Sequence, residues 1–190
     1  MEVDGRLIMT TMLYSYSRGE AEMNEYGYVT VFGSGGAGTH YEETGLVDAD
    51  GTYKVLTNSE LSQNFYGEIE PGWGEKFVNL YEYIQKIKEK DTKYSFDAVV
   101  KTEFVDTGET VYSFLVRRWI GDFDDEEVDD PKMYTDSEYA KAFKKAGIDY
   151  LTKAELQEKK NSLIREDIRN GGEIEWKLLY EDKTEELTDE

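Results

Sequence analysis

The densest run of chemically active side chains lies at residues 122–130, where seven of nine residues are acidic. Clustered carboxylates can exchange protons, coordinate cations or attract basic groups. Because the chain holds 42 acidic residues, some pair lies close in any fold, so closeness alone does not indicate acid catalysis. An unstructured loop would also bind metals weakly. We therefore interpret the run as a contact surface for a basic partner. Its acidic members are Asp122, Asp124, Asp125, Glu126, Glu127, Asp129 and Asp130.

A glycine-rich segment, residues 33–38, formally matches the G-x-G-x-x-G pattern that binds dinucleotides. That chemistry needs a helix whose N-terminus meets the pyrophosphate. Residues 39–45 follow instead, and they are too few and too β-prone to form that helix. The segment predicts a hairpin loop.

Other candidates for metal or nucleophilic chemistry are weaker. Asp48, Asp50 and Gly51 resemble part of a calcium loop, but Leu46 would then occupy the first ligand position and cannot coordinate. We expect a turn there. His40 is the single histidine, cysteine is absent, and no Ser–His–Asp set can be assembled from spacing, so we expect an incidental loop histidine. The sequence predicts no catalytic residue, cofactor or metal.

Net charge limits the possible partners. Lys and Arg number 22 against 42 acidic residues, which gives a formal charge of −20. Repulsion between like charges opposes unaided binding of so acidic a protein to DNA, RNA or an anionic membrane. Carboxylates spread over a surface can imitate phosphates, so a groove built for DNA would attract them. We expect a basic nucleic-acid-binding protein as partner and no direct DNA binding.

The location of the protein is expected to be cytoplasmic. No apolar stretch approaches the roughly 20 residues of a membrane span, and the N-terminal residues lack the pattern of a secretion signal. The absence of cysteine fits a reducing compartment.

Aromatic residues form a second global signal, because the chain has 15 tyrosines. Core packing accounts for most of them, and exposed ones would suit a protein interface or stack on sugars or bases. We expect Trp73, Trp119 and Trp176 in the core.

The elements that position these residues can be read from periodicity. Alternating β-prone runs predict strands at residues 26–32, 41–47 and 52–57. Residues 93–105 and 110–120 predict a hairpin that turns at Gly108. Apolar residues at spacings of three and four predict a helix over residues 75–90.

Two further helices are predicted from capping boxes. Thr135 with Glu138 starts one helix, which ends at Gly147, and Thr152 with Glu155 starts the next, which ends before residues 171–172. The acidic run lies before them in a loop, residues 121–131.

The pattern predicts an α+β fold with a mostly antiparallel sheet and about three helices packed on one face. Residues 1–180 are expected to form one domain, and residues 181–190 an acidic, disordered tail.

Counted from Met9, the chain resembles small phage-borne anti-CRISPR proteins that inhibit Cas9. The resemblance rests on the start at residues 9–14, the resulting length, the missing cysteines and the strong acidity. It implies a non-enzymatic inhibitor that binds a Cas9–guide RNA complex in an infected bacterial host and blocks DNA recognition or cleavage. It transfers no functional residue by position, so the acidic run, with Glu126 and Glu127 near its centre, remains the predicted contact.

Rival functions stay open from the sequence. An aromatic sheet could bind a carbohydrate or small ligand, and paired carboxylates could serve an acid-type hydrolase. A phage structural or assembly protein could be acidic only for solubility. Nothing in the sequence selects an oligomeric state.

Overall fold

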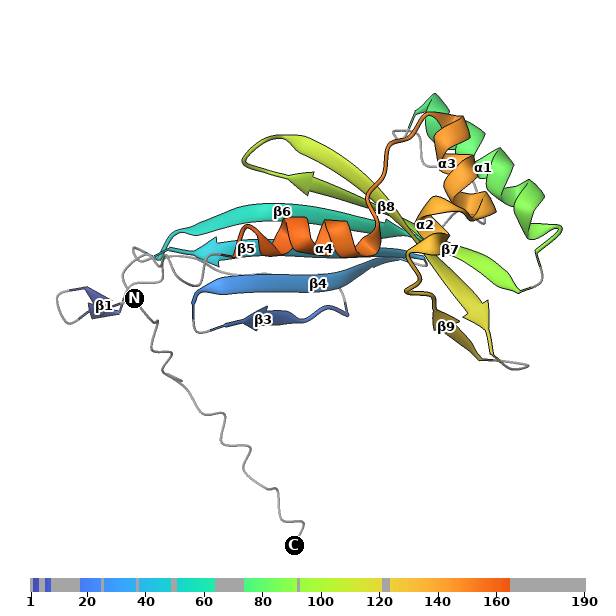
Figure 1. Ribbon diagram of the computed structural model, residues 1–190. Helices are drawn as coiled ribbons and strands as arrows, with labels where there is room; N and C mark the ends of the chain where they lie inside the picture. The colour runs from blue at the N-terminus through green and yellow to red at the C-terminus, as the bar shows by residue number, and fades with distance from the viewer. Residues whose placement is uncertain are drawn as a thin grey trace, which may run out of the picture.

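An antiparallel sheet of seven strands forms the frame of the protein (Figure 1). The computed structural model describes residues 2–3, 6–7, 18–24, 26–36, 38–48, 51–63, 74–91, 93–120 and 124–164. Neighbours in sequence pair throughout the sheet, so its spatial order follows the chain. Its strands are β3 (Ala21–Met23), β4 (Tyr28–Gly36), β5 (Thr39–Val47), β6 (Tyr53–Ser62), β7 (Tyr94–Phe104), β8 (Glu109–Trp119) and β9 (Asp125–Glu127). Two short strands, β1 (Glu2–Val3) and β2 (Arg6–Leu7), pair separately.

The β7–β8 hairpin is the longest in the sheet, and it confirms the prediction from alternating residues. Gly108 makes the turn with a φ of 67°, a conformation that glycine adopts without steric cost. The alternation divides the side chains between two faces. Face 1 carries Phe96 and Phe114, whereas face 2 carries Thr102 and Phe104.

The two preceding hairpins also match their predictions. The glycine-rich segment joins β4 to β5 as a hairpin, so it is not a dinucleotide loop. Between β5 and β6, Gly51 has a φ of 81° and its N–H donates to the Asp48 carbonyl at 2.8 Å. The predicted strands at residues 26–32, 41–47 and 52–57 correspond to β4, β5 and β6.

Three helices cover face 1 at the β7–β8 end of the sheet (Figure 1). They are α1 (Glu75–Lys88), α2 (Lys132–Thr135) and α3 (Glu138–Ala146). The predicted stripe of α1 faces inward, with Phe77, Leu80 and Ile84 buried. The α+β class with about three helices on one face is confirmed.

Aromatic rings fill the core beneath these helices. Phe114 lies 4.7 Å from Phe143, 4.8 Å from Tyr134 and 5.2 Å from Tyr150 between ring centroids. Phe96 adds a contact at 5.7 Å to Tyr139. Burying each such ring stabilises the fold by about 1.5–3 kcal/mol, so this cluster fixes α2 and α3 to the hairpin.

After α3 the chain crosses the edge of the sheet. Gly147 ends α3 in the left-handed conformation, as predicted, and the Leu151 N–H donates to the Tyr112 carbonyl at the β8 edge. Helix α4 (Lys153–Asn161) then lies on face 2. Its Lys159 ammonium sits 4.9 Å from the Phe104 ring centroid, and Lys160 pairs with Glu42 on β5 at 2.6 Å.

The helix starts differ in how well the sequence predicted them. Thr152 and Glu155 form the predicted capping box of α4. The prediction that Thr135 caps the previous helix is wrong, because Thr135 ends α2 and the Ser137 hydroxyl accepts from the Ala140 N–H at 3.0 Å. Thr135 and Ser137 are both residue types that cap helices. Because Thr135 is the last residue of α2, Ser137 is the residue that caps α3.

Several predictions concern parts of the chain outside the described residues. These are Trp73 and Trp176 and the tail at residues 181–190. The prediction that the last helix runs to just before residues 171–172 is wrong, because α4 ends at Asn161, where the hydroxyl of the C-cap residue Ser162 donates to the Lys159 carbonyl at 2.7 Å. Within the described residues, no helix has both the length and the apolarity needed to cross a membrane.

Candidate functional site

The predicted acidic contact lies where β8 passes into β9, at the edge of the sheet (Figure 1). Asp122 falls outside the described residues. The expectation of a loop over residues 121–131 is wrong in part, because Asp125–Glu127 form strand β9. The strand pairs with β8 so that Arg117 and Arg118 stand opposite Glu127 and Glu126.

Ion pairs explain why so acidic a segment forms a strand. The Arg117 Nη1 donates to Asp125 Oδ1 at 2.7 Å, and Arg118 pairs with Glu126. Glu127 pairs with Lys153, the first residue of α4. Opposite charges on neighbouring strands favour strand pairing. Without them, the three adjacent carboxylates of β9 would repel one another.

Arg117 connects the strand to the rest of the sheet. Its Nε donates to Asp97 Oδ2 on β7 at 3.0 Å, and Gln63 donates to the other oxygen of Asp97 at 3.1 Å. The hydrogen bond to Asp125 is the main reason that the pKa of Arg117 is raised above its ordinary value, followed by the bond to Asp97. The Arg117 guanidinium therefore connects β9 to β7 as well as to β8.

The remaining carboxylates of the run stay available. Asp124, Asp129 and Asp130 are exposed, and within the described residues none of them has an ion-pair partner. Asp130 also accepts a hydrogen bond from the Lys132 N–H at 2.9 Å, which starts α2. The carboxylates without an ion-pair partner thus lie at the two ends of β9, whereas Glu126 and Glu127, the predicted centre, are exposed and paired with Arg118 and Lys153.

Two large apolar side chains lie next to the Asp124 end of β9. Trp119 is 50% exposed and Ile120 is 57% exposed. The prediction of Trp119 in the core is wrong, because alternation along β8 places Phe114 and Val116 on face 1 under the helices and Trp119 on face 2. Trp119 lies opposite Asp125 in the register of β8 and β9, and the Ile120 N–H donates to the Asp124 carbonyl at 3.0 Å.

Together these residues define the candidate site, which we call the acidic edge: Trp119, Ile120 and residues 124–130. The exposed side chains of Trp119 and Ile120, which we call the apolar step, lie next to carboxylates on a strand that is paired with the sheet. The sequence signal that could have revealed Trp119 is its position one residue from the end of a predicted strand, next to the acidic run.

Alternative chemistry has less support in the described residues. His40, predicted in a loop, lies on β5, where it lines a hollow of about 510 Å³ on face 2 with Phe32 and Leu61. In the described ranges no three side chains of the metal-binding types gather into a cation site. No described tyrosine is exposed, so the expected tyrosine surface is not found in this part of the chain.

Comparison with known proteins finds no matching family model, no matching curated protein and no matching solved structure. The functional argument therefore rests on the acidic edge itself.

Proposed function

We propose that the protein is a non-enzymatic inhibitor that binds a basic nucleic-acid-binding protein through the acidic edge. The observation that supports this most is the exposed pair Trp119 and Ile120, which lies next to Asp124 at one end of β9, with Asp129 and Asp130 following its other end. Tryptophan is the residue type most enriched at the energetic centres of interfaces, and a charged rim fits the periphery.

The two parts of the acidic edge have different tasks. Carboxylates raise the rate at which a positively charged partner is encountered, and screening by salt limits their contribution to affinity. The apolar step supplies contact area that salt does not weaken. Because Arg117 fixes β9 to the sheet, little conformational entropy is lost when the partner binds.

The specific partner comes from the resemblance to anti-CRISPR proteins: a Cas9-type nuclease loaded with its guide RNA. Such a nuclease holds its target in a positively charged channel and reads a short duplex motif with arginines. The carboxylates of the acidic edge would compete with phosphates for these cations. The result would be loss of DNA recognition or cleavage in the cytoplasm of an infected bacterium.

A cleavage assay with matched variants tests the proposal. Asp124→Asn, Asp129→Asn and Asp130→Asn together remove three unpaired charges from the acidic edge. Glu20→Gln, Glu103→Gln and Asp106→Asn remove three exposed charges from other parts of the sheet and its turns. We expect the first variant to lose most of its inhibition of a guide-loaded Cas9-type nuclease and the second to retain it. Equal inhibition by both folded variants would remove the acidic edge from the mechanism.

A further inference from the structure

Two helical segments on face 1 carry a net positive charge, unlike the chain as a whole. Residues 75–91 and 138–146 contain seven lysines against five carboxylates, whereas the whole protein has a formal charge of −20. A cationic layer in so acidic a chain needs a reason beyond composition.

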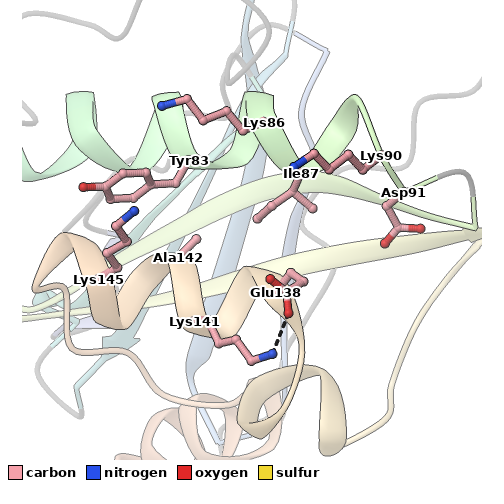
Figure 2. A pocket seen from close by; sticks show the side chains of 9 residues that line it. All are labelled: Tyr83, Lys86, Ile87, Lys90, Asp91, Glu138, Lys141, Ala142 and Lys145. Atoms are coloured by element: carbon pink, nitrogen blue, oxygen red, sulfur yellow. Dashed lines mark hydrogen bonds and ion pairs between the residues drawn. The ribbon is translucent and has the colours of Figure 1, made fainter.

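Four of these lysines line one groove between α1 and α3 (Figure 2). Lys86 comes from α1, Lys90 from the turn that follows α1, and Lys141 and Lys145 from α3. Lys141 and Lys145 are four residues apart on one helix, so they lie on the same side of α3, about 6 Å apart along its axis. The groove has a volume of about 470 Å³, within the range of small-ligand sites.

The base of the groove is apolar. Ile87 and Ala142 lie between the two rows of lysines, and Tyr83 closes one end (Figure 2). The Lys145 ammonium lies 4.0 Å from the centroid of the Tyr83 ring, and the Lys86 ammonium lies 6.0 Å from it. The ring therefore holds two cations near one end of the groove.

The two carboxylates that line this groove, Asp91 and Glu138, offset only part of the charge of its four lysines. Glu138 pairs with Lys141, and Asp91 accepts hydrogen bonds from the Lys93 and Tyr94 N–H groups at the start of β7. Among the described residues, Lys86, Lys90 and Lys145 have no ion-pair partner. Four lysines outside the groove, Lys54, Lys153, Lys159 and Lys160, are paired with carboxylates.

We propose that this lysine groove binds an organic phosphate that carries at least two negative charges and a compact apolar body. Lysine ammonium groups bind phosphate as point charges, and three unpaired ones around a concave surface would relieve their mutual repulsion by taking up such an anion. The apolar base formed by Ile87, Ala142 and Tyr83 would contact the organic part. This site is separate from the acidic edge, and its function does not depend on the proposed partner.

Titration of the intact protein with four probes at about 50 mM salt tests this site, with backbone amide chemical shifts as the readout. The probes are ADP, inorganic pyrophosphate, adenosine and tetraglutamate. We expect saturable shifts at Ile87 and Ala142 with ADP, weaker binding of pyrophosphate, and no binding of adenosine. Tetraglutamate binding as tight as that of ADP would overturn the assignment to phosphate, and the absence of saturable ADP binding would overturn the site.

A matched pair of variants distinguishes binding in the groove from a general effect of the protein's net charge. Lys145→Gln and Lys54→Gln each remove one exposed positive charge, and Lys54 lies on β6, outside the groove. We expect Lys145→Gln to weaken ADP binding about fivefold and Lys54→Gln to leave it unchanged. Equal weakening by both variants would show that only the net charge matters and would contradict the proposal.

Discussion

Arg117 on β8 and Asp125 on β9 form an ion pair with 2.7 Å between Nη1 and Oδ1, and this contact turns an acidic run into a strand. The same guanidinium reaches Asp97 on β7, so one cation connects three neighbouring strands. The carboxylates of β9 form ion pairs within the chain, whereas those at the two ends of the strand form none. The carboxylates at the ends therefore remain for a partner.

Replacing Arg117 tests this arrangement. Arg117→Met leaves Asp97, which is only 12% exposed, without its cation, so we expect the free energy of unfolding in urea to fall by about 1–2 kcal/mol. The Val128 N–H, which donates to the Val116 carbonyl beyond β9, should exchange with solvent faster. Arg118→Met breaks an exposed pair and serves as the control, with an expected loss below about 0.5 kcal/mol. Equal losses in the two variants would show that Arg117 has no special role.

Trp119 should matter for binding and not for stability. Because half of its surface is already exposed, Trp119→Ala should leave the unfolding midpoint nearly unchanged. It should weaken binding to the partner by tenfold or more, as the loss of an interface anchor does. Phe32→Ala is the control, since Phe32 is the other exposed aromatic residue described and lies on β4, away from the acidic edge. A Trp119 variant that binds normally would exclude an apolar anchor at this edge.

The capping box of α4 gives a prediction that depends on pH. Hydrogen bonding from the Thr152 N–H lowers the pKa of Glu155 below its ordinary value of 4.5. A pKa lowered by folding stabilises the protein above the ordinary value, and this stabilisation is lost as the pH falls through the lowered one. Glu155→Gln should therefore be less stable than the wild type at pH 7 and equally stable near pH 3, as measured by thermal unfolding. A constant difference across this range would contradict the assignment.

Thr152→Ala provides the uncharged counterpart. It removes the hydroxyl that accepts from the Glu155 N–H at 3.1 Å, and we expect a loss of about 1 kcal/mol in the free energy of unfolding. Ser162→Ala, at the other end of α4, is a suitable control because its hydroxyl donates to a carbonyl at the end of the helix. A comparable loss in both variants would show that the N-terminal cap is not specific.

Tyr134 should make the core sensitive to alkali. Burial is the main reason that its pKa is raised to about 12, and its hydroxyl donates to the Phe114 carbonyl at 3.1 Å. A pKa raised by folding favours the native state below the ordinary value of 10.0, and this contribution is lost as the pH rises toward 12. Tyr134→Phe should cost about 1 kcal/mol at pH 7, and its stability should decline less between pH 10 and 12. Parallel pH profiles for the two proteins would contradict this account.

Local patterns predicted the hairpins and helix stripes well. Gly108 and Gly147 marked a turn and a helix end because each needs a positive φ, which is a property of the residue itself. The capping box at Thr152 was likewise a local pattern. Thr135 failed because two neighbouring residues, Thr135 and Ser137, could both serve as a cap, and tertiary packing of Tyr134 decided between them.

The candidate site was less predictable because its decisive contacts are not local. The acidic run could be seen in the sequence, but its pairing with Arg117 and Arg118 depends on a strand that forms only against β8. Trp119 has the same apolar type as a core residue, and its exposure follows from its position on face 2, opposite the helices that cover face 1. Lys153 on α4 pairs with Glu127 because the chain crosses the edge of the sheet before α4, which a local sequence pattern does not indicate.

The salt dependence of binding tests the central claim most directly. The dissociation constant for a guide-loaded Cas9-type nuclease should be measured between about 0.05 and 0.5 M salt for the wild type and for the Asp124, Asp129 and Asp130 amide variant. We expect the affinity of the wild type to fall steeply with salt and that of the variant to be lower and to change less. An affinity that is the same at all salt concentrations, or equal slopes for the two proteins, would contradict recognition through the carboxylates of the acidic edge.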